Sequence, residues 1–146
     1  MPALGLPRAP WRRWRALPRD ERRATLALAA LIPAAACAVR VLGLERTLRL
    51  VAAPGHRHPD APAAARDAQR ALQRAAAWSP YAGNCLSRSL ALAYWLARRG
   101  IATEFKIGTR LDDGRLDAHA WVEHDGVALT PQGPYDATFS LAARRA

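Results

Sequence analysis

The chain has 146 residues, 51% of them hydrophobic, and a formal net charge of +10. This length and composition predict a globular protein with a modest core, and two cysteines argue against a disulfide framework and suit a reducing cytoplasm. Lys106 is the single lysine, so the positive charge is almost entirely arginine. It favours acidic partners, whether nucleic acid, anionic lipid or an acidic peptide, and does not choose among them.

The N-terminal part combines a basic segment with an apolar run. Trp11, Trp14 and a series of arginines occupy positions 8–23, and residues 26–39 carry no charge. Three interpretations remain open: an export signal, a buried core helix, and a helix that lies on an anionic membrane surface. The uncharged run is shorter than the ~20 residues that a membrane span takes. We expect residues 1–60 to form a basic and apolar helical region.

The second part of the chain, residues 61–146, is predicted to form the core that carries the chemistry. It opens with a helix from Ala61 to about Trp78, for which Asp60 is a favoured N-cap type. The loop before this helix contains His56 and His58, which we expect to be exposed to solvent. The histidines and cysteines of the chain do not show the spacing of a zinc site, so we predict no metal.

Cys85 opens the next predicted helix, residues 85–99. The turn before it ends in Asn84, a favoured N-cap type, which puts the thiol in the first turn of the helix. Backbone N–H groups at a helix start, together with the helix dipole, favour a thiolate and are able to hold an oxyanion. The alternative is a buried small hydrophobe, the commoner role of a free cysteine.

After this helix the apolar spacing changes from helical to alternating, which predicts strands. We expect three antiparallel strands joined by Asp-Gly turns, at residues 101–108, 116–124 and 127–132. On the second strand His119, Trp121 and Glu123 share one face. An imidazole on a strand that follows a helix-starting cysteine is the pairing of a thiol nucleophile with its base. Trp121 is expected to shield that imidazole from water.

A third residue commonly fixes the tautomer of such a histidine. If Asp125-Gly126 forms the hairpin turn, His119 lies directly opposite Gln132, with Thr130 as the diagonal neighbour. Gln132 is therefore the geometric candidate. Asp136 reaches the ring only if the chain folds back after Pro134, and a dyad without a third residue remains an alternative.

Three segments of the chain resemble a known family. Residues 85–92 (CLSRSLAL), 98–101 (RRGI) and 118–123 (AHAWVE) are similar to motifs of the stand-alone B2 proteins of lasso-peptide biosynthesis, bacterial members of the transglutaminase-like superfamily. The resemblance extends from Cys85 to about Thr130. It implies an α+β fold, in which a helical N-terminal part precedes a papain-like transglutaminase core with the cysteine-bearing helix packed on an antiparallel sheet.

The activity that this resemblance implies is removal of the leader peptide from a ribosomally made lasso precursor by a cysteine protease, a step of antibiotic biosynthesis that needs no cofactor. Cys85 matches the nucleophile and His119 the general base and acid. The family's third residue, commonly an aspartate, falls where this chain has Thr130-Pro131-Gln132, which leaves the role to glutamine or to the backbone. Asn84 and Tyr81 are the nearest candidates for a second oxyanion donor beside the Cys85 N–H, with Trp121 close to the substrate.

The resemblance also implies partners: the precursor's leader, a leader-recognition protein (B1-type) and an ATP-dependent macrolactam cyclase. We expect no nucleic acid. Two alternatives remain, a membrane-surface or nucleic-acid binding module with a non-catalytic core, and a transglutaminase-like acyltransferase that uses an amine in place of water. We expect a cytoplasmic protein, with peripheral membrane association through the N-terminal region as the alternative.

Overall fold

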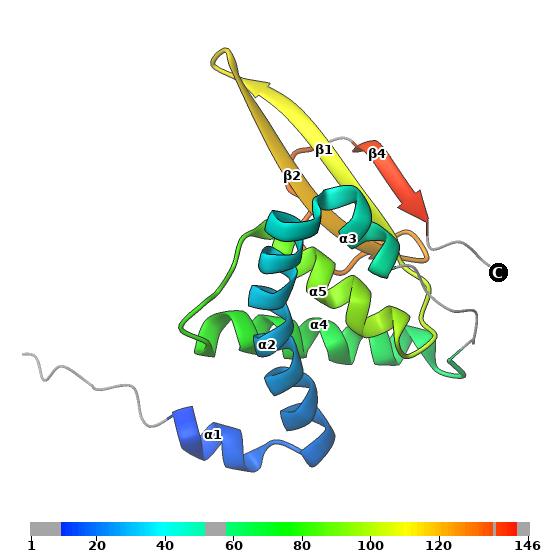
Figure 1. Cartoon of the computed structure of the whole chain (residues 1–146). Helices are drawn as coiled ribbons and strands as arrows, with labels where there is room; N and C mark the ends of the chain where they lie inside the picture. Colours follow the sequence, from blue (N-terminus) through cyan, green and yellow to red (C-terminus); the bar gives the residue numbers. More distant parts are fainter. Residues whose placement is uncertain (1–9, 52–57, 136, 143–146) are drawn as a thin grey trace, which may run out of the picture.

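The computed structural model describes residues 10–51, 58–135 and 137–142, so His56 and Asp136 lie outside the described residues. All the helices precede the strands along the chain (Figure 1). The helices are α1 (Pro10–Ala16), α2 (Arg19–Leu42), α3 (Leu44–Val51), α4 (Ala61–Trp78) and α5 (Cys85–Ala97). The strands are β1 (Glu104–Asp112), β2 (Arg115–His124), β3 (Val127–Ala128) and β4 (Ala137–Ala142).

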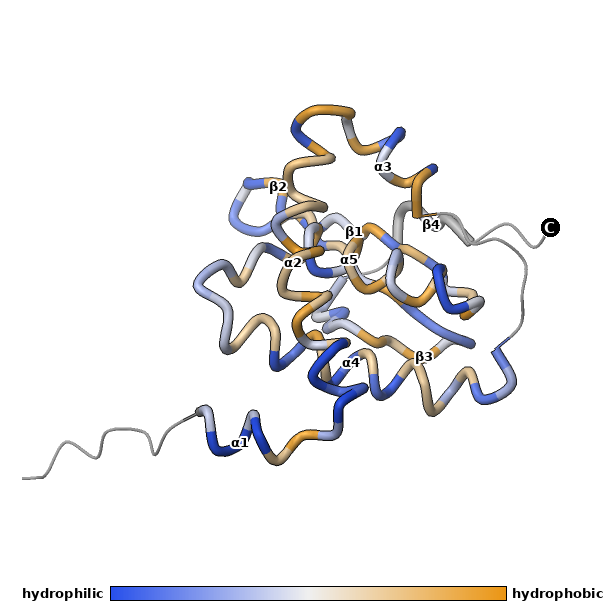
Figure 2. Tube along the Cα trace, turned by 60° about the horizontal axis from the view of Figure 1, so that its bottom comes forward, coloured by the Kyte–Doolittle hydropathy of each residue, from blue (hydrophilic) through white to orange (hydrophobic). Residues whose placement is uncertain are grey.

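Helix α2 is the centre of the helical layer. It crosses α4 and α5 and packs against both (Figure 1). Leu28 and Ile32 on its inner face are fully buried, in the same hydrophobic cluster as Leu90, Leu92 and Leu96 of α5. The core therefore continues across residue 60, where the sequence suggests a division of the chain. Figure 2 shows α2 as hydrophilic at its first turn and apolar along its middle turns.

The strands form an antiparallel sheet in the order β3-β2-β1-β4. Both Asp-Gly turns have positive φ at their two central residues, 47° and 77° at Asp113 and Gly114, 48° and 78° at Asp125 and Gly126. Such φ values are those of a type I′ turn, whose twist matches that of the flanking strands. The β1–β2 hairpin is long, and its tip projects beyond the helices (Figure 1).

One face of this sheet closes the core. Phe105 pairs with Val122 and Ile107 with Ala120, and all four pack into the helical cluster. Because side chains alternate along a strand, His119, Trp121 and Glu123 lie on the opposite face. The α+β class expected from the sequence is confirmed, with helix α5 packed on the sheet.

The structure differs from the expected strands both in their bounds and in their number. The first strand spans Glu104–Asp112 instead of residues 101–108, and it starts late because the Ile101 N–H bonds to the Leu96 carbonyl (3.0 Å) and caps α5. The third strand ends at Ala128 instead of residue 132. The fourth strand, β4, was not expected; it pairs with β1 after the chain has crossed two strands.

Candidate active site

The start of α5 is fixed by a reciprocal capping box. The Asn84 side chain accepts a hydrogen bond from the Ser87 N–H (2.9 Å), and the Ser87 hydroxyl accepts one from the Asn84 N–H (3.0 Å). The expected N-cap role of Asn84 is thus confirmed. By contrast, Asp60 occupies the N-cap position of α4 but makes no side-chain capping bond. The capping box makes Cys85 the first residue of α5.

The loop before Cys85 is held against α2. Gly83 has a φ of +69°, and a Cβ at this position would overlap Ile32 and the Ser87 hydroxyl. The Arg88 side chain adds a bond from its Nε to the Ala82 carbonyl (2.6 Å). Glycine is therefore required at position 83 both by backbone conformation and by space. Helix α2 supports the start of α5 through this contact.

Cys85 is half-buried and reduced. The N–H groups in the first turn of a helix have no preceding helical carbonyl, so those of Cys85 and Leu86 are free to bond to a ligand. The Asn84 amide uses its oxygen in the capping box, which leaves its NH₂ group as a second donor. A groove of about 440 Å³ lies alongside, lined from α2 and from the helix start, with Tyr81, Asn84 and Leu86 among its walls.

One turn further along α5, a buried hydroxyl network joins the helix to β2. Val122 N–H donates to the Thr130 hydroxyl (2.9 Å), which lies 3.2 Å from the Ser89 hydroxyl, and Ser89 donates to the Ala120 carbonyl (3.2 Å). Ser89 is fully buried and Thr130 nearly so. A satisfied buried network of this kind specifies one arrangement of the two elements. It places Cys85 about 6 Å along the helix from the contact with β2.

His119 is held by the chain that follows β3. Its Nε2 contacts the Pro131 carbonyl. Because a carbonyl oxygen only accepts, this ring nitrogen carries the proton, which leaves Nδ1 of a neutral imidazole free to accept one. The cross-strand partner of His119 is Gly108, so no side chain lies directly opposite the ring.

Aromatic rings support the imidazole on its strand. It stacks against Trp121 at 6.1 Å and Tyr135 at 5.0 Å between ring centroids. The Tyr135 hydroxyl donates to the Asp117 carboxylate, and this hydrogen bond raises the pKa of Tyr135 above its usual range. Trp121 is fully buried, and its indole packs beside the imidazole.

A buried carboxylate completes this support. Trp121 donates from Nε1 to Glu123 (2.9 Å), and Lys106 forms an ion pair with the same carboxylate (2.7 Å). The hydrogen bond from Lys106, followed by that from Trp121, lowers the pKa of Glu123. The bond to Glu123 in turn raises the pKa of Lys106. The indole that flanks His119 is thereby fixed in orientation.

Gln132 makes no hydrogen bond to the imidazole. Its side-chain amide donates to the Tyr135 carbonyl (3.0 Å), and the contact with His119 comes from the backbone of the preceding residue, Pro131. The expected register holds for His124 and Val127, but β3 ends before it reaches His119. The strand therefore does not bring Gln132 opposite the ring, and a backbone carbonyl occupies the place expected for its side chain.

In the part of the chain that the structure describes, the Cys85 thiol and the His119 ring share no hydrogen bond. Two consecutive residues join them: Thr130 contacts Ser89, one turn after Cys85, and Pro131 contacts the imidazole. The imidazole lies on the face of the sheet that is opposite to the helices. Catalytic hydrogen bonds are often long or absent until a substrate binds, so the absence of this bond does not rule out the pair.

Sequence patterns point to some of these supporting residues and not to others. Ser89 interrupts an apolar helix one turn after Cys85, which is a signal of a specific polar contact. Pro131 and Tyr135 contact His119 from the segment between β3 and β4, and no sequence pattern marks them. Among the described residues, no group of three or more His, Cys, Asp or Glu side chains is placed to hold a metal ion.

Comparison with known proteins gives one match. A family model described as Transglut_core3, the transglutaminase-like superfamily, matches residues 27–141 and so includes both Cys85 and His119. No curated protein and no solved structure matches the chain at a significant level. The matched region begins inside α2, in agreement with the shared core of α2, α4 and α5. The chain therefore belongs to the transglutaminase-like superfamily, whose members are usually catalytic, as cysteine proteases or acyltransferases.

Proposed function

We propose that this protein is a cysteine peptidase that removes the leader peptide from a ribosomally synthesised lasso-peptide precursor. The observation that carries the proposal is the position of Cys85. It is the first residue of a capped helix, next to backbone N–H groups that have no helical partner. The superfamily match supports thiol chemistry. The lasso-specific part is supported by the motifs around Cys85 and His119.

In the proposed reaction, the Cys85 thiolate attacks the carbonyl carbon of the peptide bond between leader and core. His119 first takes the thiol proton on Nδ1 and then gives it to the leaving amine of the core peptide, so that a thioester to the leader remains. Water attacks this thioester, His119 takes the water proton, and the Cys85 sulfur leaves. The products are the leader as a carboxylic acid and the core with a free amine.

The oxyanion of each tetrahedral intermediate needs donors close to the sulfur. The Cys85 N–H at the helix start is the first, and the unused NH₂ group of Asn84 is the second. Tyr81 is 45% exposed and lines the adjoining groove, which suits it to contact with the bound peptide instead. Pro131 holds the imidazole in the tautomer that leaves Nδ1 free.

The same thioester serves an acyltransferase if an amine replaces water. The experiment is therefore incubation of the purified chain with a lasso-peptide precursor, with and without an added primary amine, followed by mass spectrometry. A leader ending in a free acid supports the peptidase. If the main product is instead a leader joined to the added amine, the protein is a transferase and the proposal is overturned.

Three variants make this test specific. Cys85→Ala and His119→Ala are expected to slow processing by roughly a thousandfold or more, because removal of a nucleophile or its base leaves only binding effects. Cys37→Ala is the control for loss of a thiol alone: Cys37 is exposed on α2, in the wall of the groove, and this variant is expected to keep cleaving the precursor, in contrast to Cys85→Ala. Normal processing by Cys85→Ala would sink the proposal.

The proposal includes partners that act on the same precursor. A leader-recognition protein would present the peptide, and an ATP-dependent macrolactam cyclase would close the ring after cleavage. The arginine-rich surface suits an acidic leader or an acidic partner surface. Genes for these two proteins beside that of the chain support this assignment, and their absence weakens it.

A further inference from the structure

The outer face of α2 is apolar although it is exposed. Residues 26–39 contain no charged side chain, whereas a helix with one face in water normally carries polar residues there. The exposed positions recur every three or four residues and so form one stripe along the helix. We call this the α2 stripe; it consists of Leu26, Ala30, Pro33, Ala34, Cys37 and Val41.

The opposite face of α2 is committed to the core. Leu28 and Ile32 are fully buried between α4 and α5. By length and composition alone α2 is able to cross a membrane, but crossing would expose the core that these two residues complete. The geometry instead suits a helix that lies flat, with an apolar run of 14 residues, about 21 Å long.

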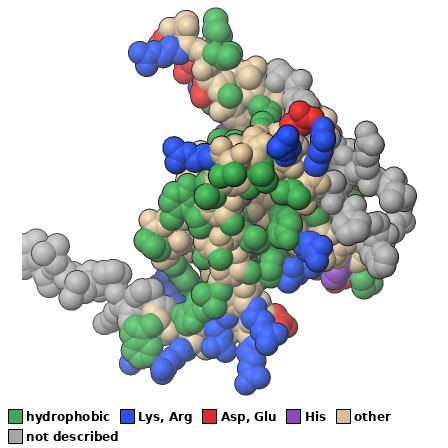
Figure 3. All heavy atoms as spheres, viewed as in Figure 1, with side chains coloured by type: hydrophobic (Ala, Val, Ile, Leu, Met, Phe, Trp, Pro, Cys, Tyr) green, Lys and Arg blue, Asp and Glu red, His purple; other side chains and the backbone are tan. Residues whose placement is uncertain are grey.

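Cations flank both ends of the α2 stripe. Arg19 and Arg23 are exposed before it, and Arg40 lies exposed at its far end. Figure 3 views this side of the molecule and shows hydrophobic side chains along its middle, with Lys and Arg side chains gathered at the lower end. An apolar band between basic ends matches the layers of an anionic bilayer, where acyl chains lie beneath charged headgroups.

Helix α1 extends the basic end with an aromatic side chain. Trp11 is 53% exposed, and the guanidinium groups of Arg12 and Arg15 lie 5.7 and 5.2 Å from the centre of its ring. An exposed indole beside cations is suited to the interface between headgroups and acyl chains, where its apolar body and polar N–H are both accommodated.

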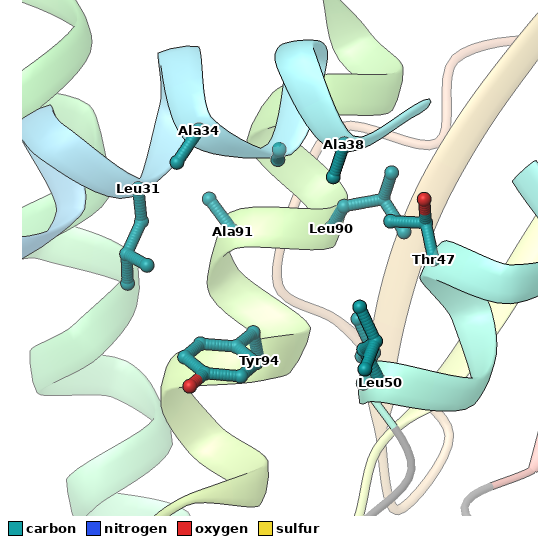
Figure 4. A pocket seen from close by; sticks show the side chains of 10 residues that line it. Leu31, Ala34, Ala38, Thr47, Leu50, Leu90, Ala91 and Tyr94 are labelled. Carbon is teal, nitrogen blue, oxygen red and sulfur yellow. The ribbon is translucent and has the colours of Figure 1, made fainter. Parts of the chain in front are cut away.

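A shallow hollow continues the apolar surface from α2 to α3 (Figure 4). It has a volume of about 170 Å³, and its walls come from α2, α3 and α5, with Leu31, Ala34, Leu50 and Tyr94 among them. Leu50 is 60% exposed at its rim. The hollow offers room for an apolar group that enters from the same side as the α2 stripe.

We propose that the α2 stripe docks on the surface of an anionic lipid bilayer. A second copy of the chain is a poorer occupant, because its own arginines and its net charge of +10 would meet the same charges here. A bilayer supplies the opposite charge at both ends of the stripe. Pro33 and Cys37 also line the groove beside Cys85, so a docked bilayer would form the outer wall of that groove.

The test is co-sedimentation of the full chain with vesicles of phosphatidylcholine alone and of phosphatidylcholine mixed equally with phosphatidylglycerol. Binding to the mixed vesicles is expected, and it should weaken at high salt. It should fall roughly tenfold or more in Leu26→Glu, which puts a charge repelled by anionic headgroups in place of an exposed leucine that would enter the acyl layer. Leu111→Glu at the hairpin tip is the matched control, since Leu111 is 74% exposed and far from α2 in the fold. It is expected to bind like the wild type.

Each other outcome overturns the proposal. The first is absence of binding to the mixed vesicles, and the second is equal binding by Leu26→Glu and the wild type. A wild-type dimer that Leu26→Glu converts to a monomer, without vesicle binding by either, would assign the stripe to a second copy. Retention on vesicles through an alkaline carbonate wash would indicate insertion across the bilayer instead of surface docking. Circular dichroism of both variants checks that they fold, as expected for exposed positions.

Discussion

Helices α2 and α5 are both apolar and both carry a cysteine, yet the fold uses them in opposite ways. Eight of the 13 residues of α5 are buried, compared with three of the 24 residues of α2. Helix α5 is enclosed between the sheet and the other helices, and its N-terminus remains accessible. Helix α2 uses one face for the core and leaves the other uncovered. Apolar composition alone therefore does not distinguish a core helix from one that offers a surface.

The two cysteines show the same contrast. Cys85 begins its helix, where N–H groups have no helical partner. Cys37 lies in the interior of α2, where the helix satisfies the neighbouring N–H groups, and its thiol faces outward. Only Cys85 combines a thiol with free backbone donors. Position within the helix, more than exposure, separates a candidate nucleophile from a surface thiol.

The largest expected difference between the two helices concerns packing. Leu92→Ala in α5 removes a fully buried side chain and is expected to lower the free energy of unfolding by about 2 to 5 kcal/mol. Leu26→Ala in α2 changes a side chain that is 60% exposed, with an expected change within about 0.5 kcal/mol. Urea unfolding of both variants measures the difference. Equal losses would show that the outer face of α2 is covered in the folded protein.

Two glycines with positive φ provide a matched pair, one at the end of α2 and one before α5. Gly83→Ala introduces a Cβ into Ile32 and Ser87 at a φ of +69°, whereas Gly43→Ala meets no atom at +83°. We expect a loss of about 3 kcal/mol for Gly83→Ala, from strain together with overpacking, and about 1 kcal/mol for Gly43→Ala.

Thermal or urea unfolding of the two glycine variants checks this order. Iodoacetamide alkylation of Cys85 adds a readout for the loop itself, because displacement of residues 81–84 would alter access to the thiol. An equal loss of stability in both variants would mean that backbone strain alone matters, and that α2 does not brace the start of α5.

Local sequence signals predicted the start of α5 and the extent of α4 well. The Asn84 cap acts within four residues, and α4 runs from Ala61 to Trp78 as its spacing indicates. The Asp-Gly turns were also recognisable, since φ above zero restricts the residues that fit. Such features depend on short stretches of chain, so their residues identify them.

Features that depend on distant pairing were not predictable in the same way. Strand β4 pairs with β1 instead of its predecessor β3, and the connecting chain brings the Pro131 carbonyl, in place of the Gln132 side chain, to His119. Nothing in the alternation of residues 127–132 indicates that pairing stops at Ala128. The orientation of the imidazole therefore follows from the path of the whole chain, while its presence on β2 follows from the motif.

A smaller difference in stability between the two helices is expected for their buried hydroxyl groups. Ser89 in α5 bonds across to β2, whereas Thr25 in α2 donates to the Glu21 carbonyl of its own helix (2.8 Å). Ser89→Ala leaves the Thr130 hydroxyl and the Ala120 carbonyl with fewer partners, and we expect a loss of about 1 to 3 kcal/mol. Thr25→Val removes a bond within the helix and is expected to cost less than about 1 kcal/mol.

A double-mutant cycle with Thr130→Val tests whether the Ser89 effect belongs to the network. The two substitutions are expected to be less costly together than the sum of their separate losses, because each one already breaks the same chain of bonds. Additive losses would instead indicate two independent sites. Urea unfolding curves of the four proteins provide the measurement.

The smallest expected effect concerns pH and the sheet that carries His119. The pKa of Glu123 is lowered by its hydrogen bonds with Lys106 and Trp121, so its stabilising contribution is present above the ordinary value of about 4.3 and is lost as pH falls through the lower folded value. The pKa of Lys106 is raised, so its contribution is present below about 10.4 and is lost as pH rises through the higher folded value.

Glu123→Gln is therefore expected to reduce stability at neutral pH, and its difference from the wild type should shrink in acid, below about pH 4.3. The matched control is Glu45→Gln in α3, next to α2, because the Glu45–Arg49 pair is exposed, with 80% and 74% of the two side chains accessible. Exposed pairs contribute little, so this variant should follow the wild-type curve. The measurement is the free energy of unfolding across the acid range. If Glu123→Gln differed from the wild type by the same amount at every pH, the Glu123–Lys106 pair would not contribute to the pH dependence of stability.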